Sequence, residues 1–189
     1  MTKKELRKIY LEKRKALTTH EKAKLDDLLL IQFQKIAIPF INSLFSYWPI
    51  EDNNEPDTHL ITDYLEFKNP ELQVSYPRID SFINEMEAIL TDSETSFMQN
   101  EFNIYEPETG TIFPAQAIDM VLVPLLIFDK KGYRIGYGKG FYDKYLAGCR
   151  KDCIKAGFSY FEPVDEITDK ADFDVPLDFC ITPQTVYVF

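Results

Sequence analysis

The segment "DMVLVPLLIFDKKGYRIGYGKGFYDKYL", residues 119–146, carries the strongest structural signals in this chain of 189 residues. It opens with a continuously apolar run, Met120–Val123, which predicts a buried strand that ends at Pro124. Four of the seven glycines of the chain then fall between Gly132 and Gly140, and a helical pattern begins at Phe141. A glycine-rich loop between a strand and a helix predicts a place where backbone amides approach an anion closely.

The charged side chains of this loop suit phosphate binding. Arg134 and Lys139 supply positive charge. Asp143 falls in the first turn of the following helix, where it can interact with the helix dipole or ligate a magnesium ion. The loop does not match a P-loop, because Tyr133 stands where glycine is required. It does not match the dinucleotide fingerprint either, because Phe141 replaces the third glycine. These residues leave a phosphate site and a tight structural loop both open.

The rest of the chain alternates between strand and helix patterns. A helical stripe runs through Leu6, Ile9, Tyr10, Lys13 and Leu17, and a second covers residues 25–36 behind a capping box of Thr18 and Glu21. Strands are predicted over residues 43–49, 71–79, 85–90, 153–160 and 177–183, a further helix over 56–67, and a loop over 102–110. The alternation predicts an α/β fold, a three-layer sandwich with a mostly parallel sheet flanked by helices, in a single domain over residues 1–189. In such sheets ligands bind beyond the carboxyl ends of the strands, which is where the glycine loop falls.

The composition restricts the kind of function. The 45% of hydrophobic residues includes no run of about 18 apolar residues, so we expect a soluble globular protein without a membrane span. No signal peptide pattern begins the sequence, and we expect a cytoplasmic protein. Three cysteines without a C-x-x-C pair argue against a disulfide framework or a zinc knuckle. With only His20 and His59, histidine catalysis is disfavoured and any metal should be a hard, oxygen-liking ion.

Charge is distributed unevenly along the chain. Residues 1–24 hold nine Lys/Arg against three Glu, a balance of +6. The whole chain has a net charge of −10, so the remaining residues carry −16. Such a basic start indicates a solvated helix face, an anion site or a nucleic-acid-binding arm. The acidic remainder argues against nucleic acid as a partner.

The pattern D-x-x-L-V-P-x-x-x-F-D-x-x-G-x-R-I-G-Y-G-K-G-F-Y-D-K-Y-L over residues 119–146 resembles the signature of the 5-formyltetrahydrofolate cyclo-ligase family, the 5,10-methenyltetrahydrofolate synthetases. Weaker features follow in the family's order: K-x-x-x-R at the start, "YWP", "EPDT", "YPRI", "FNIYEP" and "DVPLDFCIT". The resemblance spans nearly the whole chain. It implies a fold of the NagB/RpiA/CoA-transferase-like type. It also implies an ATP- and Mg²⁺-dependent enzyme that cyclises 5-formyltetrahydrofolate to 5,10-methenyltetrahydrofolate, with release of ADP and phosphate, through phosphorylation of the formyl oxygen.

The resemblance also implies roles for individual positions. ATP-binding residues are implied at Lys3, Lys4, Arg7, Arg134, Ile135, Gly136, Tyr137, Gly138, Lys139, Gly140, Phe141 and Tyr142. Folate contacts are implied at Trp48, Glu55, Tyr137, Gly138, Lys139, Gly140 and Phe141, with Tyr47 beside them. The resemblance implies catalytic roles for Arg134, Gly138, Gly140 and Asp143. Magnesium ligands are implied at Asp143 and Asp174.

Several alternatives stay open at this stage. Glu51 competes with Glu55 for the folate contact, and Asp172 and Asp178 compete with Asp174 because the family's proline and glutamate upstream are missing. Lys139 and Phe141 replace a glycine and a tyrosine usual in the family. A sugar-phosphate isomerase or an acyl-CoA transferase on a similar fold is the rival enzyme, and a nucleic-acid binder is the rival of another class. The expected partner is a reduced folate as small-molecule substrate, with no nucleic acid and no membrane, and nothing in the sequence requires more than a monomer.

Overall fold

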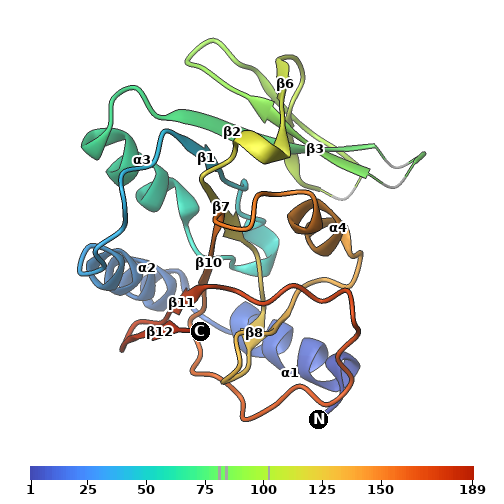
Figure 1. The fold of residues 1–189 in the computed structure, drawn as a ribbon. Coiled ribbons are helices and arrows are strands. Elements are labelled where there is room, and N and C mark those ends of the chain that lie inside the picture. The colour runs from blue at the N-terminus through green and yellow to red at the C-terminus, as the bar shows by residue number, and fades with distance from the viewer. Residues whose placement is uncertain (81, 84, 102) are drawn as a thin grey trace.

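The computed structural model describes residues 1–80, 82–83, 85–101 and 103–189, arranged around one eight-stranded sheet (Figure 1). The strand order is β12-β11-β10-β7-β1-β2-β3-β6. These strands are β1 (Ser43–Phe45), β2 (Gln73–Asp80), β3 (Glu85–Leu90), β6 (Thr111–Phe113), β7 (Met120–Val123), β10 (Ile154–Phe158), β11 (Phe179–Ile181) and β12 (Val186–Val188). The helices are α1 (Lys3–Lys15), α2 (Thr19–Phe33), α3 (Thr58–Lys68) and α4 (Phe141–Ala147), with 3-10 turns η1 (Glu51–Asn53) and η2 (Ala115–Ala117).

The centre of the sheet is parallel and its margins are antiparallel. Strands β2, β1, β7, β10 and β11 run parallel, whereas β3, β6 and β12 pair antiparallel with their neighbours. From β1 the chain crosses through α3 to β2 on one side, and from β7 it crosses through α4 to β10 on the other. The connections therefore diverge at the β1–β7 pair. In open α/β sheets a crevice for ligands forms at such a switch point, beyond the carboxyl ends of the strands.

Helices cover both faces of the sheet because side chains alternate along each strand. Leu44, Met120 and Leu122 belong to the core cluster that α2 and α3 cover. Their neighbours Phe45 and Val121 belong to the opposite cluster, into which α4 packs. Figure 1 shows α2 and α3 on one side of β1 and β7 and α4 on the other. The prediction of a three-layer α/β sandwich with a mostly parallel sheet is confirmed.

Two local predictions need correction. The loop predicted over residues 102–110 contains β5 (Tyr105–Pro107), which pairs antiparallel with β4 (Phe97–Gln99); residue 102 itself lies outside the described residues. Glu106 stabilises this arrangement, because its carboxylate accepts hydrogen bonds from the Ile79 backbone N–H at 3.1 Å and the Asn100 side chain at 2.9 Å. The short β5 pairs with a segment that precedes it in the chain, and neither strand is long enough to show a period.

The second correction concerns α1. The predicted stripe placed Lys13 on the inward face, but the structure buries Arg14 beside Leu6 and leaves Lys13 exposed over the ring of Tyr10. The positions seven and eight residues after Leu6 both belong to its broad helix face. The structure buries the second of them, Arg14. The capping box predicted at Thr18 and Glu21 is confirmed, and Thr2 with Glu5 forms another at the start of α1.

A buried aspartate shapes the chain between β7 and α4. Here β8 (Ile127–Phe128) and β9 (Arg134–Ile135) form a small hairpin. Asp129 at its turn is fully buried, and its Oδ1 accepts the backbone N–H groups of Lys131 at 2.9 Å and Tyr133 at 3.0 Å. Its Oδ2 accepts the N–H of Ile167 at 3.1 Å, so both carboxylate oxygens are used.

This arrangement predicts that Asp129→Asn destabilises the protein. An amide has only one acceptor oxygen, so one of the backbone N–H groups would face an NH₂ donor. We expect a loss of about 1–3 kcal/mol in the free energy of unfolding, measured by urea denaturation. Asp165→Asn is the matched control, because that side chain is 90% exposed, and its effect should stay within about 0.5 kcal/mol. Equal stabilities for the two variants would contradict the assignment.

Candidate active site

A cavity of about 490 Å³ opens at the carboxyl ends of β1, β2 and β7. Its wall brings together most residues that the sequence singled out: Lys3, Arg7, Tyr47, Trp48, Glu55, Arg134, Ile135, Gly136, Tyr137, Gly138, Lys139, Gly140, Phe141, Tyr142, Asp143 and Asp174. Four candidates are not in this wall. Lys4 and Asp172 are exposed, Asp178 pairs with Lys155, and Glu51 lines a smaller neighbouring cavity of about 140 Å³. The geometry thus favours Asp174 over its two rivals and Glu55 over Glu51.

The glycine loop packs closely against α1. Gly138 has φ +88°, a conformation that L side chains rarely adopt, and a Cβ there would lie 3.1 Å from the Arg7 guanidinium carbon. Arg7 in turn donates from Nε to the carbonyl oxygen of Gly136 at 2.9 Å. Gly140, with φ +76°, is the residue before α4. Bare backbone is therefore required at Gly138 both for its conformation and for the approach of the arginine.

One end of the cavity gathers cations and carboxylates. Arg134, whose side chain is 5% exposed, donates to Asp143 Oδ1 at 3.1 Å and to the Val175 carbonyl oxygen at 2.6 Å. Burial lowers the pKa of Arg134, while the neighbouring Asp143 and Asp174 act in the opposite direction. Lys3 forms an ion pair with Asp174. This mixture of charges suits a polyphosphate, which needs cations, together with a divalent metal, which needs carboxylates.

The metal expectation can be tested against the donor set. Within the described ranges there is no group of three or more His, Cys, Asp or Glu that would enclose a metal ion. Magnesium bound with a nucleotide uses only one or two carboxylates, and phosphate oxygens and waters complete its octahedron. Asp143 and Asp174 line the same cavity and both act on Arg134. The two carboxylates therefore fit magnesium that arrives with a phosphate ligand, and they do not form a site for the metal alone.

Glu55 is buried at the boundary between the two cavities, with 2% of its surface exposed. Its Oε2 accepts the Ile50 N–H at 2.7 Å, and its Oε1 accepts the Tyr137 hydroxyl at 2.6 Å. The guanidinium of Arg14 lies 3.8 Å from Oε1. Burial raises the pKa of Glu55, and Arg14 and Tyr137 partly offset that rise. The glutamate thus belongs to a hydrogen-bonded unit and is not a freely rotating acid.

Another part of the cavity wall is apolar and aromatic. Trp48 lies 4.8 Å from the ring of Phe97 and 5.2 Å from that of Tyr105, centroid to centroid. Tyr142 also lines the cavity, and its buried hydroxyl has no hydrogen-bond partner in the described part of the chain. An unpaired buried hydroxyl is costly, so a polar ligand atom at this wall would stabilise it. This part of the wall suits a flat heterocycle that carries polar edges.

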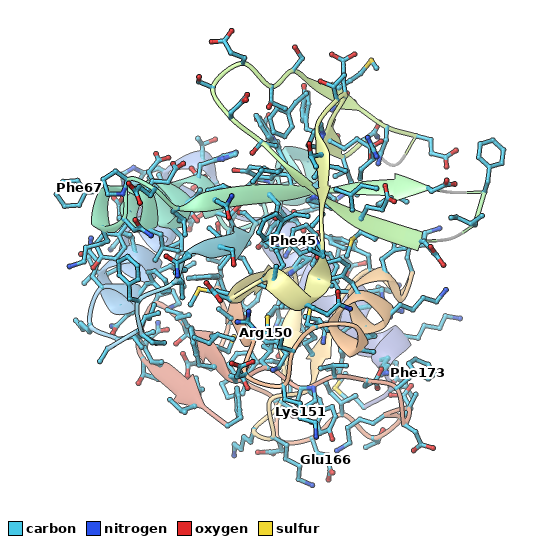
Figure 2. The ribbon with its side chains drawn as sticks, turned by 45° about the horizontal axis from the view of Figure 1, so that its top comes forward. Phe45, Phe67, Arg150, Lys151, Glu166 and Phe173 are labelled. Atoms are coloured by element: carbon cyan, nitrogen blue, oxygen red, sulfur yellow. The ribbon has the colours of Figure 1, made fainter. Side chains whose placement is uncertain are left out.

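Sequence reasoning missed part of this wall, namely Ile50, Asn53, Pro77, Ile79, Met86, Ile104, Pro124 and Phe173. Pro77 and Ile79 alternate along β2, so the period of the strand could have placed them on one face. Phe173 is 70% exposed and lies at the periphery of the molecule (Figure 2). Its position next to the candidate Asp174 was the only signal in the sequence. Arg14 lies behind the wall, and sequence reasoning included it only in the count of basic residues at the start of the chain.

Comparisons with known proteins identify what this arrangement resembles. The model of the 5-formyltetrahydrofolate cyclo-ligase family matches residues 1–183. A 5-formyltetrahydrofolate cyclo-ligase of Mycoplasma pneumoniae is 33% identical over 189 residues, which cover 97% of this chain and 100% of the relative. The structure of Aquifex aeolicus 5,10-methenyltetrahydrofolate synthetase superposes with a TM-score of 0.82 at 28% identity, covering 100% of this chain and 93% of the other. A synthetase structure from Mycoplasma pneumoniae gives 0.75 at 30% identity, covering 96% and 98%.

The loop geometry predicts a ranked effect of alanine substitutions. Gly138→Ala meets both the positive φ and the Arg7 contact. Gly140→Ala meets only the φ, since no atom of the described residues outside its own neighbourhood lies within 4 Å of its added Cβ. At Gly136 the nearest atom is the Pro124 oxygen at 3.7 Å, an ordinary contact. We expect losses of about 1–2 kcal/mol in the free energy of unfolding at Gly140, somewhat more at Gly138 and little at Gly136. Thermal unfolding of the three variants measures the order, and a Gly136 variant as unstable as Gly138→Ala would contradict it.

Proposed function

The chain belongs to the 5-formyltetrahydrofolate cyclo-ligase family, and from that premise we propose that it converts 5-formyltetrahydrofolate to 5,10-methenyltetrahydrofolate with ATP and magnesium. One observation carries the proposal. A single cavity combines the cation–carboxylate cluster around Arg134 with the aromatic wall around Trp48. A triphosphate and a pterin can therefore meet in one enclosed space, and its volume of about 490 Å³ lies within the range of small-molecule sites.

The chemistry needs the phosphate and the folate side by side. The formyl oxygen on nitrogen 5 attacks the γ-phosphorus of ATP, so an O–P bond forms and ADP leaves. Nitrogen 10 then attacks the activated formyl carbon and loses its proton. The C–O bond breaks, phosphate departs with the former formyl oxygen, and the methenyl bridge retains one positive charge. Both reacting nitrogens belong to one molecule, so positioning and neutralisation of charge supply most of the catalysis.

Residue roles follow from the charges in the cavity. Lys3, Arg7 and Arg134 would bind the phosphates, and the backbone at Gly138 and Gly140 would lie close to the transferring group. Asp143 and Asp174 would hold magnesium. When bound, the metal would neutralise phosphate charge and make ADP a better leaving group. Lys139 contributes positive charge to the same wall.

Folate recognition is assigned to the other half of the cavity. Trp48, Glu55 and Tyr137 line it, with Phe141 beside them. A buried carboxylate suits the N–H groups of a pterin edge, because charge-assisted hydrogen bonds are strong in an enclosed site. A sugar-phosphate isomerase would have no use for this aromatic wall. The low histidine count is also consistent with a reaction that needs no imidazole base.

The first experiment follows the near-ultraviolet absorbance of the methenyl product. With 5-formyltetrahydrofolate, ATP and magnesium the protein should form product, and omission of ATP or magnesium should abolish it. Asp143→Asn should lower kcat by about 100-fold or more, because it removes a charge that acts on the metal in the transition state.

Asp172→Asn is the matched control, since that aspartate is exposed and lies outside the cavity wall, and its kcat should equal that of the wild type. The melting temperature of each variant separates misfolding from loss of function. Product formed at the same rate without metal, or by Asp143→Asn, would refute the magnesium assignment. No product from the intact wild-type protein would refute the proposed activity and would turn attention to another phosphate substrate.

A further inference from the structure

Arg14 is a buried arginine whose contacts join four segments of the chain. With 2% of its surface exposed, it is among the largest fully buried side chains. Its Nε donates to the Asn53 carbonyl oxygen at 2.7 Å, and its Nη1 donates to the Leu125 carbonyl oxygen at 2.9 Å. Its Nη2 donates to the hydroxyl of Tyr137 and lies 3.8 Å from Oε1 of Glu55. One side chain thus connects α1 with η1, with the segment after β7 and with the glycine loop.

The direction of these hydrogen bonds fixes the orientation of Tyr137. The phenol oxygen accepts from Arg14, and its O–H proton donates to Glu55 at 2.6 Å. The guanidinium also lies over the tyrosine ring, 5.7 Å from its centroid. Neither the charge of Arg14 nor that of Glu55 reaches solvent, so each serves as the counter-ion of the other.

We propose that Arg14 is a positioning residue for the folate side of the reaction, which holds Glu55 and Tyr137 in the geometry that the pterin requires. The proposal rests on the proposed function and extends it to a side chain outside the cavity wall. Arg14 touches neither substrate, and it acts through the two residues that line the cavity. A lysine could keep the charge but could not reach the same acceptors, because it lacks the planar fork of donors.

The nucleotide side has anchors of its own. Arg7 holds the Gly136 carbonyl oxygen, and Lys3 is fixed through its ion pair with Asp174 and through its backbone N–H, which donates to Asp169 at 2.7 Å. These contacts lie two turns of α1 or more away from Arg14. Loss of Arg14 should therefore weaken folate binding much more than nucleotide binding.

Arg14 also determines the charge state of the folate wall. The charged and titratable side chains that act on Glu55 come from several elements. They are Arg14 from α1, Lys22 from α2, and Tyr137 from the glycine loop. Burial, and after it the charge of Glu55, in turn raises the pKa of Tyr47 after β1 and of Tyr142 on α4. Of these, Arg14 has the largest effect in keeping Glu55 ionised. Without it the carboxyl would take up a proton at a higher pH than in the wild-type protein.

Trp48 provides a direct measurement that needs no turnover. It is the only tryptophan of the chain and it lines the cavity, so bound folate should quench its fluorescence. We expect Arg14→Met to weaken the binding of 5-formyltetrahydrofolate by about 10- to 100-fold, a loss typical of misplaced binding groups. Arg14→Lys should fall in between. Lys15→Met is the matched control, because Lys15 is exposed on the same helix, and it should bind as the wild type does. Calorimetry should show ATP affinity changed by less than threefold in all variants.

The pH dependence separates positioning from a general loss of structure. If the ionised Glu55 binds the pterin, folate affinity rises with pH as this carboxyl loses its proton. The midpoint should lie higher in Arg14→Met than in the wild type, since the cation that lowers the pKa of Glu55 is gone. A variant that is merely less stable would show a lower affinity at every pH with an unshifted midpoint. Tyr137→Phe, which removes only the relay hydroxyl, tests the same unit and should also weaken folate binding.

Each outcome is informative. Wild-type protein that binds no folate would refute the proposed function. Wild-type protein that binds folate while Arg14→Met binds equally well would refute the role of Arg14 alone. An equal loss of folate and ATP affinity, or an unshifted midpoint in a folded Arg14→Met variant, would show that Arg14 is only a structural support.

Discussion

The buried contact between the guanidinium of Arg14 and the pair Glu55–Tyr137 is the interaction on which the geometry of the cavity depends. The glycines of the loop have no side chains that could pack, so contacts from other segments must hold the loop in place. Helix α1 holds the loop at two points: Arg7 donates to the Gly136 carbonyl oxygen, and Arg14 donates to the Tyr137 hydroxyl. The same arginine binds the backbone just after β7, which links the loop to the centre of the sheet. The basic helix therefore forms part of the cavity wall.

Charge around Arg134 is balanced locally. Arg134 is almost fully buried and would be costly without a counter-ion, and Asp143 provides one. Lys3 and Asp174 form a second such pair at the same end of the cavity. Bound phosphates would pair with the cations and bound magnesium with the carboxylates, so each charged side chain would keep a partner of opposite charge. Two aspartates would then suffice for magnesium, since a nucleotide would bring the remaining oxygen ligands.

Much of the site was predictable because its residues lie close together in sequence. The loop from Arg134 to Asp143 supplies charge, bare backbone and a carboxylate within ten residues, and its position after a buried strand placed it at the carboxyl edge of the sheet. Distant members were harder to find. Asp174 and Glu55 were chosen among neighbouring acids by resemblance alone, and only their burial and position separate them from Asp172 and Glu51. The β4–β5 pair escaped prediction because three-residue strands have no measurable period.

The sequence by itself determined the alternation of strands and helices, the position of the glycine loop and the acidic, histidine-poor chemistry available to it. These properties are local, and hydrophobic period, glycine content and residue type record them directly. Only the tertiary structure decided that Arg14 points inward, that the Tyr137 hydroxyl joins it to Glu55, and that apolar residues of β2 and β3 line the cavity. A charged residue on an amphipathic helix is normally solvated, and it is buried only where acceptors from other segments converge on it. Asn53, Leu125 and Tyr137 converge on Arg14 because the β1 and β7 strands lie side by side, and no pattern within α1 records that pairing.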